Sequence, residues 1–243
     1  MINTEPYEIC TVRGIKVVQL EVCLIVTLGF HSDIGLRRIA DRGVKTADRI
    51  LVIFGPSIPA SEKAVKEFKL YASKAGVKEE NMQTLRIDPA EPWKGIPAIA
   101  QKIREVCGDR RIVVEAGGGL RGITVMLMLA LFSMKRSFSV ETSIEGTDSD
   151  LEIPEGFIQF LMSRLGTKDS QLLRAVLNSG NMSVKDIAKA TGCGEKTVVN
   201  RISYLKKLGL VERKGRSPLK LTPWGEAAAL LSEESRELLE KKS

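Results

Sequence analysis

Three consecutive glycines, Gly117–Gly119, and an arginine, Arg121, lie between a short apolar run and a longer one. Main-chain N–H groups in a glycine turn at the start of a helix bind phosphate, and a guanidinium adds a forked donor for the same anion. The spacing of Gly117, Gly119 and Gly122 also satisfies G-x-G-x-x-G, the pattern of a dinucleotide-binding turn. The stretch therefore predicts a dinucleotide site, another kind of phosphate site, or only a tight turn.

Three features weaken the dinucleotide alternative. The glycine pattern follows the fourth predicted strand, whereas the dinucleotide fingerprint follows the first strand of its unit. Arg121 lies inside the pattern and offers a side-chain fork in addition to main-chain amides. An acidic residue about twenty positions further on should bind a ribose, and Glu141 has that spacing but lies inside a predicted strand.

The chain offers little for metal or hydrolytic chemistry. Its four cysteines, Cys10, Cys23, Cys107 and Cys193, are far apart, and His31 is the only histidine, which argues against a zinc site. A Ser-His-Asp or Cys-His arrangement would need His31, and no nucleophile motif accompanies it. We therefore expect no catalytic residue, no metal and no cofactor. Cys193 precedes a predicted helix, where it is either a redox sensor or a packing residue.

The composition indicates a soluble globular protein of one or two domains: 243 residues, of which 43% are hydrophobic. The longest strongly apolar run, residues 123–132, is too short to span a bilayer. Arg13 and Lys16 precede an apolar stretch, but Glu21 interrupts the pattern and no A-x-A site follows, so we expect no signal peptide. The expected location is cytoplasmic, with no membrane partner.

The net charge of +7 is unevenly distributed along the chain. Residues 1–166 hold 22 Lys and Arg against 21 Asp and Glu, whereas residues 167–243 hold 15 against 9. Within residues 168–220 the ratio is 12 against 4. A basic segment in an otherwise neutral chain is typical of nucleic-acid binding, although a solvated basic surface gives the same balance.

The N-terminal part alternates short β-rich runs with amphipathic helical stretches. Strands are predicted at residues 23–30, 49–55, 83–88 and 111–116, each followed by a helix, at 33–43, 60–76, 92–108 and 120–134, and a hairpin over 138–154 closes the series. Such alternation indicates an α/β fold with a parallel sheet covered on both faces, which binds ligands beyond the carboxyl ends of its strands. Residues 1–21 fit no predicted element.

After a connecting helix at 154–166, the pattern becomes that of a winged helix-turn-helix, an α+β domain. Helices are predicted at residues 167–180, 183–192 and 194–209, followed by a basic hairpin at 210–222 and a last helix at 223–241. Ser183 and Asp186 stand where a capping box begins the second helix, and Gly192 ends it.

The third helix of this motif is the predicted recognition helix. Val198, Ile202 and Leu205 share its inward face. The predicted base readers lie on other faces: Lys196, Thr197, Asn200 and Arg201. Three wing residues are predicted to reach phosphate or the minor groove: Arg213, Lys214 and Arg216. A winged helix also serves protein contacts in some proteins, and the basic charge favours DNA.

Two motifs resemble those of a known family. The stretches "VTLGFHSDIGLRRI" (26–39) and "EAGGGLRGITVMLMLAL" (115–131) are similar to segments of the CARF–winged-helix transcriptional regulators of type I-A CRISPR systems, where CARF denotes CRISPR-associated Rossmann fold. The second family segment is written [DN]-x-[ST]-x-G-x-[RK]. Gly119 and Arg121 fit it, whereas Glu115 and Gly117 depart from it, and Gly117 has no hydroxyl where the family motif has Ser or Thr.

The resemblance covers about residues 22–240 and implies a homodimer with a Rossmann-like domain that binds cyclic oligoadenylate, often cyclic tetra-adenylate. Carried onto this chain, the family's pocket predicts these ligand-binding residues: Gly29, Phe30, His31, Ser32, Gly117, Gly118, Gly119, Leu120 and Arg121. The loop at 54–59 and Trp93 would flank a base, although Phe30 and Trp93 are equally compatible with core or rim positions.

The resulting hypothesis is a dimeric, ligand-responsive regulator of CRISPR-related genes that binds double-stranded promoter DNA. It assigns residues 1–21 to an extension, 22–153 to the CARF domain, 154–166 to a linker helix and 167–243 to the winged helix. Two alternatives stay open. One is a redox repressor that senses NAD(H). The other is a ring nuclease, in which a ribose 2′-OH attacks in line and Arg121 stabilises the charge.

Overall fold

A computed structural model describes residues 10–12, 15–17, 21–43, 48–56, 58–144, 147, 149–163, 167–180, 182–213 and 217–240. The chain divides into two compact units, Met1–Leu127 and Met128–Ser243, with the boundary inside helix α4 (Arg121–Ser133). Over the described residues, no helix is both long and apolar enough to cross a membrane.

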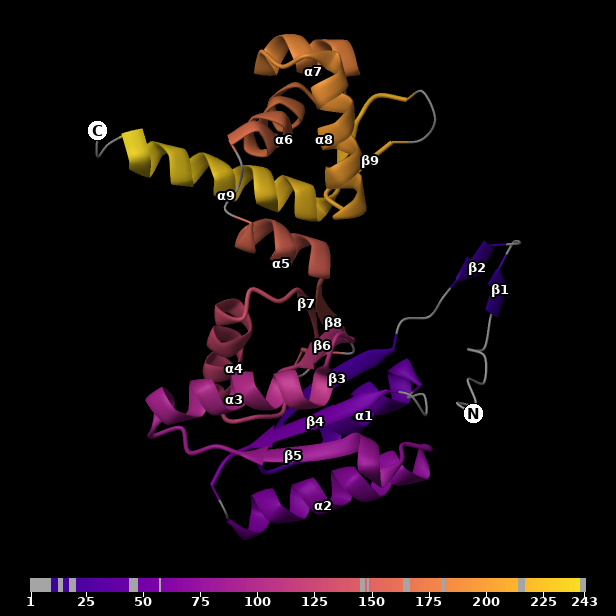
Figure 1. The fold of residues 1–243 in the computed structure, drawn as a ribbon, viewed down its shortest axis with the longest axis vertical. Helices are drawn as coiled ribbons and strands as arrows, with labels where there is room; N and C mark the ends of the chain where they lie inside the picture. Colours follow the sequence, from indigo (N-terminus) through magenta and orange to yellow (C-terminus); the bar gives the residue numbers. More distant parts are fainter. Residues whose placement is uncertain are drawn as a thin grey trace, which may run out of the picture. The chain divides into compact units, whose positions relative to one another are not determined.

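A six-stranded sheet has the order β5-β4-β3-β6-β7-β8. Its strands are β3 (Val22–Leu28), β4 (Arg49–Phe54), β5 (Met82–Arg86), β6 (Arg111–Glu115), β7 (Phe138–Ser143) and β8 (Asp150–Ile153). β3 pairs in parallel with β4 and β6, and β4 pairs in parallel with β5, whereas β7 and β8 form an antiparallel pair. The predicted mostly parallel, Rossmann-like sheet and its closing hairpin are confirmed (Figure 1).

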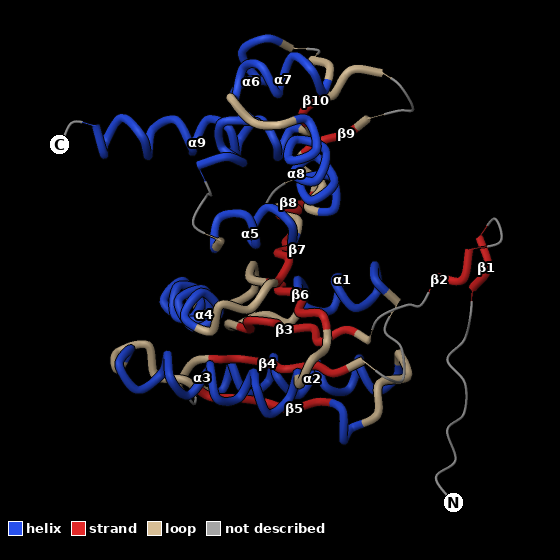
Figure 2. Tube along the Cα trace, turned by 45° about the horizontal axis from the view of Figure 1, so that its top comes forward, coloured by secondary structure: helices blue, strands red, loops and turns tan. Residues whose placement is uncertain are grey.

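A helix follows each parallel strand (Figure 2): α1 (Asp33–Arg42), α2 (Pro59–Lys74), α3 (Pro92–Cys107) and α4. A short 3-10 helix, η1 (Glu79–Asn81), precedes β5. One face of the sheet packs on α1 and α2, since Leu24 and Val26 of β3 share a cluster with Ile39 of α1 and Phe68 of α2. Cys23, which forms a disulfide bond with the last residue of α3, points to the face of the sheet opposite α1 and α2. Both faces of β3 are therefore buried, which explains its uninterrupted apolar sequence.

A disulfide joins Cys23 of β3 to Cys107 at the end of α3, across 84 residues of sequence, and both cysteines are fully buried. The cysteine spacing did not predict this pairing. It depends on α3 ending beside the first residues of β3, a tertiary contact that no local pattern records. Cys193 is free and half-buried.

Two short strands, β1 (Cys10–Val12) and β2 (Ile15–Val17), pair antiparallel in the segment for which no element was predicted. Three-residue strands are too short to give a readable alternation of apolar and polar residues.

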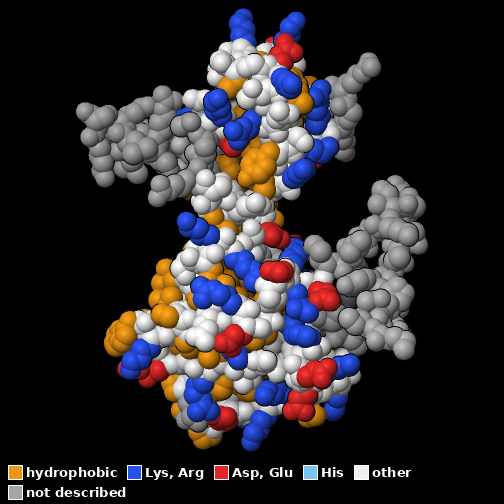
Figure 3. Space-filling view, in the orientation of Figure 1, with side chains coloured by type: hydrophobic (Ala, Val, Ile, Leu, Met, Phe, Trp, Pro, Cys, Tyr) orange, Lys and Arg blue, Asp and Glu red, His pale blue; other side chains and the backbone are white. Residues whose placement is uncertain are grey.

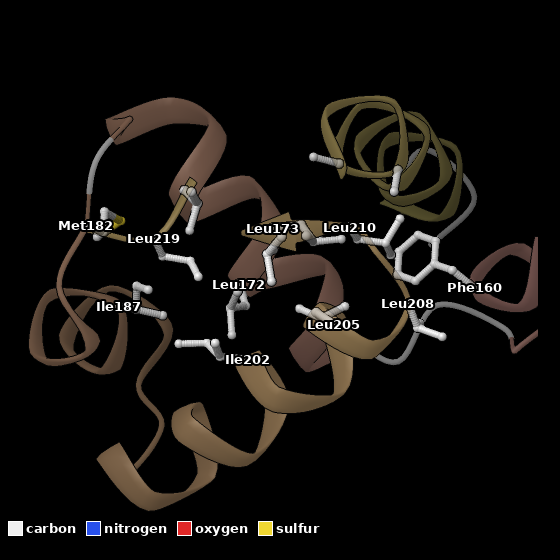
Figure 4. Close-up of a cluster of buried hydrophobic side chains, with 14 of the residues drawn as sticks. Phe160, Leu172, Leu173, Met182, Ile187, Ile202, Leu205, Leu208, Leu210 and Leu219 are labelled. Carbon is white, nitrogen blue, oxygen red and sulfur yellow. The ribbon is translucent and has the colours of Figure 1, made fainter. Parts of the chain in front are cut away.

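The predicted winged helix is confirmed in the second unit. Its elements after α5 (Glu155–Met162) are α6 (Thr167–Ser179), α7 (Val184–Thr191), α8 (Glu195–Lys207), the antiparallel pair β9 (Val211–Glu212) and β10 (Lys220–Leu221), and α9 (Pro223–Glu240). Figure 4 shows Leu172 of α6, Ile187 of α7 and Ile202 of α8 pointing into one interior. Packing of these apolar faces fixes the direction in which α8 presents its opposite face.

The predicted capping box begins α7. The Ser183 hydroxyl accepts a hydrogen bond from the Asp186 main-chain N–H at 3.2 Å, and the Asp186 carboxylate accepts from the Ser183 main-chain N–H at 3.2 Å. The Ser183 hydroxyl also donates to that carboxylate at 2.6 Å, which lowers the pKa of Asp186 below its ordinary value. Gly192, with φ of 64°, ends the helix.

Candidate functional site

Two turns meet at the carboxyl ends of the neighbouring strands β3 and β6. Because Val26 of β3 is in register with Glu115 of β6, the residues that follow both strands emerge at the same edge of the sheet. A Cβ on Gly29 would lie 2.8 Å from the carbonyl oxygen of Gly118, and one on Gly118 would lie 2.7 Å from the carbonyl oxygen of Thr27. These glycines are required because the two backbones touch.

Gly119 also lies too close to its neighbour for a side chain: a Cβ there would lie 2.5 Å from the Cβ of Thr27. None of the three glycines of the turn has a positive φ. The glycine run is thus a tight, closely packed turn, and its shape places Leu120 and Arg121 at the start of α4. The tight-turn alternative and the ligand-site alternative are therefore compatible.

A buried ion pair ties the glycine turn to α1. Glu115, which is fully buried, accepts a hydrogen bond from Nε of buried Arg38 at 3.0 Å and another from the main-chain N–H of Gly117 at 2.9 Å. The Gly117 N–H therefore donates its hydrogen bond to the Glu115 carboxylate. The family's motif has Asp or Asn at position 115, and here the longer carboxylate points into the interior. Arg38 was missed because one of two adjacent arginines in an amphipathic helix looks like a solvent-facing residue.

Arg121 is the first residue of α4 and its side chain is exposed. The described residues supply no ion-pair partner for it. The first turn of α4 is fastened to the preceding loop, because the Thr124 hydroxyl donates to the carbonyl oxygen of Ala116 at 3.3 Å. A solvated guanidinium at the positive end of a helix is suited to bind an anion.

An apolar cavity of about 120 Å³ lies at the same edge of the sheet. It is lined by Gly29, Phe30, Gly55, Pro56, Ile58, Ser61 and Leu120. Three predicted ligand residues, Gly29, Phe30 and Leu120, therefore meet the predicted loop at 54–59. Phe30 is exposed, whereas Leu120 packs towards Gly55, where a Cβ would lie 2.8 Å from its Cδ1.

The remaining predicted ligand residues lie in different surroundings. His31 is exposed. Ser32 is buried and its hydroxyl donates to the Glu67 carboxylate of α2 at 3.1 Å, so it joins the start of α1 to the middle of α2. Trp93, at the start of α3, is exposed and is not among the cavity's lining residues. Glu141 lies in the middle of β7, opposite Glu152 of β8, as predicted for a strand position.

The predicted recognition helix, α8, presents a mostly polar face to solvent. Val198, Ile202 and Leu205 are buried, as predicted, and Lys196, Thr197 and Asn200 are exposed. Figure 3 shows Lys and Arg side chains gathered on the visible face of the winged-helix unit. This arrangement leaves the N-terminal half of α8 accessible to a major groove.

Arg201 differs from the other predicted base readers. Its guanidinium donates to the Asp169 carboxylate of α6 at 3.0 Å, which anchors α8 on α6. Burial raises the pKa of Asp169, and the charge of Arg201 opposes that shift. In this state the guanidinium is engaged within the domain, although the side chain stays 44% exposed.

The predicted wing residues are only partly described. Arg213 is half-buried and its Nε donates to the carbonyl oxygen of Ser217 at 2.9 Å, which joins the two sides of the hairpin. Lys214 and Arg216 lie outside the described residues. Their predicted contacts to phosphate or the minor groove stay predictions.

The sequence-based prediction did not single out two residues on the exposed face of α8. Val199 and Ser203 lie three and seven positions after Lys196, so they share its side of the helix, and both are exposed. The helical spacing could have identified them. Val199 was overlooked because it adjoins the buried Val198.

Comparison with known proteins assigns the family. Residues 22–154 match the Csa3 CRISPR-associated Rossmann-like domain, which is more than half of the chain. The chain belongs to the Csa3 family. The predicted resemblance is thereby confirmed, and the Csa3 match ends where the sheet's last strand has ended. A second family model, HVO_A0114, matches residues 164–226, over the winged helix.

Beyond the Csa3 family match, one relative covers most of the chain. It is the "CRISPR locus-related putative DNA-binding protein Csa3" of Saccharolobus solfataricus, 23% identical over 193 residues, which are 79% of this chain and 80% of that protein. Among solved structures, Bordetella bronchiseptica BpsR is 28% identical over 33% of this chain and 61% of its own, with a TM-score of 0.32. The Staphylococcus aureus MepR–DNA complex is 18% identical over 36% and 68%, with a TM-score of 0.31.

Proposed function

We propose that this chain is a dimeric regulator that binds promoter DNA of CRISPR-related genes through its winged helix and senses cyclic oligoadenylate, with cyclic tetra-adenylate as the first ring to test. The observation that carries the proposal is the contact between the turns after β3 and β6, which places a solvated Arg121 and an apolar cavity at one edge of the sheet. The Csa3 family match and the name of the S. solfataricus relative support it.

The two chemical parts of an oligoadenylate suit the two parts of this edge. Each phosphate is an anion, for which Arg121 at the N-terminus of α4 offers a forked donor in a favourable helix field. Adenine has broad apolar faces, for which the cavity beside Phe30 offers apolar walls. Leu120, which lines the cavity, directly precedes Arg121, and an anion site next to a base site supports a nucleotide ligand over a simple anion.

An apolar stripe on α4 supports the homodimer. Val125, Leu129 and Phe132 are spaced at i, i+4 and i+7 and are between 43% and 58% exposed, and Figure 3 shows hydrophobic side chains over α4. A second copy of the same stripe would cover it. Because the stripe begins one turn after Arg121, parallel pairing of two α4 helices about a two-fold axis would bring both Arg121 side chains to the same end of the pair, where one ring of phosphates would contact both.

The DNA-binding step rests on α8 and the basic charge of residues 168–220. Exposed Lys196, Thr197 and Asn200 supply a cation and hydrogen-bonding groups for phosphates and base edges. Two recognition helices related by the dimer axis predict half-sites one helical turn apart, or a multiple of it. The ligand then acts by binding one dimer geometry more tightly than another.

Calorimetric titration of the purified full chain with cyclic tetra-adenylate and, separately, with NAD(H) tests the sensor. The proposal predicts one cyclic tetra-adenylate per dimer and, for Arg121→Ala, a loss of at least tenfold in affinity, since a hydrogen bond to a charged group contributes about 1.5–3 kcal/mol. Binding of NAD(H) in place of the oligoadenylate would overturn it, as would equal affinity of the Arg121→Ala variant. Linear di-adenylate after long incubation would show cleavage of the ring.

A further inference from the structure

The exposed face of α8 contains one apolar side chain among polar ones. Val199 is 51% exposed, whereas the other aliphatic residues of the helix, Val198, Ile202 and Leu205, are buried in the winged-helix core. Val199 is absent from that core and from the half-buried side chains packed against it. Its neighbours on the exposed face are Lys196 and Ser203.

Stability within the domain does not account for a valine at this position. A β-branched residue is a weaker helix former than the lysine or glutamate that solvent-facing helix positions commonly hold. Half of the Val199 side chain also stays in water, so its burial contributes little. The same features suit recognition, because the branched side chain has one strongly preferred χ1 rotamer in a helix and is already ordered before it binds.

The partner group follows from the chemistry of the major groove. Among the base edges there, the 5-methyl group of thymine is the apolar one, and the remaining groups donate or accept hydrogen bonds. Asn200, next to Val199, is the residue type that binds adenine through two hydrogen bonds. Each adenine of a duplex faces a thymine, so one A·T pair can present both groups to adjacent residues of α8.

We infer that Val199 is a specificity-determining residue that contacts the 5-methyl group of a thymine in the operator. The inference rests on the proposed DNA-binding function and names one base that α8 recognises. Loss of one buried methyl is expected to weaken binding about fourfold, which corresponds to ~0.8 kcal/mol. Asn200 and Lys196 position the helix on the duplex through hydrogen bonds that this loss leaves in place.

Replacement of thymine by uracil tests the contact, because it removes only the methyl group. Duplexes are first selected from a randomised library with the full-length protein, and each dT of the selected sequence is then replaced by dU in turn. Dissociation constants are measured by fluorescence anisotropy at one salt concentration, since phosphate contacts make affinity depend on salt. The variants are Val199→Ala and, as a matched control, Leu70→Ala, which truncates an exposed apolar residue on α2.

We expect one dT→dU replacement to weaken binding of the wild type and of Leu70→Ala about fourfold and to leave the affinity of Val199→Ala unchanged. A selected sequence in which every dU is tolerated, or a dU effect that persists in Val199→Ala, would overturn the inference while the DNA-binding function stands. Failure of the wild type to select any sequence would overturn the DNA-binding function itself, and the inference with it.

Discussion

The buried ion pair between Arg38 and Glu115 gives the sharpest test of how the edge of the sheet at the ends of β3 and β6 is built. Glu115→Gln keeps the volume of the side chain and an oxygen for the Gly117 N–H, but it leaves the Arg38 guanidinium buried without the Glu115 carboxylate. Breaking a buried pair in this way costs about 3–5 kcal/mol of unfolding free energy. Since a domain of this size is stable by about 5–15 kcal/mol, the loss is a large fraction of the total.

Urea denaturation of the full chain, followed by circular dichroism, measures this change. The matched control is Arg37→Met, because the neighbouring Arg37 forms only an exposed pair with Asp41 at 3.8 Å and should change stability by less than about 1 kcal/mol. The double variant Arg38→Met, Glu115→Gln should recover most of the loss, because neither charge of the pair is then buried. A Glu115→Gln change as small as that of the control, or no recovery in the double variant, would refute the reasoning.

Three further predictions concern the disulfide, the winged helix and the dimer. Cys23→Ser should lower the unfolding free energy by about 4.5 kcal/mol, because the unfolded chain gains the conformational entropy that a closed loop of this length removes. Wild type in reducing buffer should show the same loss. Equal stability of wild type and Cys23→Ser in oxidising buffer would contradict this. Because burial raises the pKa of Asp169, the folded state binds its proton more tightly than the unfolded state. Asp169 therefore contributes most stability below its unfolded pKa, and this contribution is lost as pH rises through the folded value. The stability of wild type relative to Asp169→Asn should fall over that window in pH-dependent denaturation, and a constant difference would refute the assignment. Leu129→Glu should convert the proposed dimer to monomers in sedimentation velocity, because it places a charge in the proposed α4 contact. A Leu129→Glu variant with the same sedimentation coefficient as the wild type would exclude that surface.

Periodicity predicted most of the architecture. The alternation of β-rich runs with amphipathic helices predicted that β3, β4, β5 and β6 are parallel, and the caps Ser183 and Gly192 marked both ends of α7. These features are local, since they depend on spacing within one element or on the residues that flank it. For the same reason the buried and exposed faces of α8 followed from helical spacing alone.

Pairwise tertiary contacts were not predictable in this way. The Cys23–Cys107 disulfide and the Arg38–Glu115 ion pair join residues that are far apart in sequence, and neither position carries a distinguishing pattern. Arg201 shows the same difficulty on a smaller scale. Its place away from the inward face of α8 predicts a base contact, whereas the structure pairs it with Asp169 of α6. Local spacing places a side chain on a face but does not identify its partner.

The central claim is that a ligand at the β3–β6 edge changes how tightly α8 binds DNA. The direct measurement is the dissociation constant of a selected duplex for the full chain, with and without saturating cyclic tetra-adenylate, for wild type and Arg121→Ala. The account predicts a change of about 5- to 150-fold in the wild type, in the range of ordinary allosteric coupling, and no change in Arg121→Ala. The same dissociation constant for the wild type with and without the ligand would contradict it.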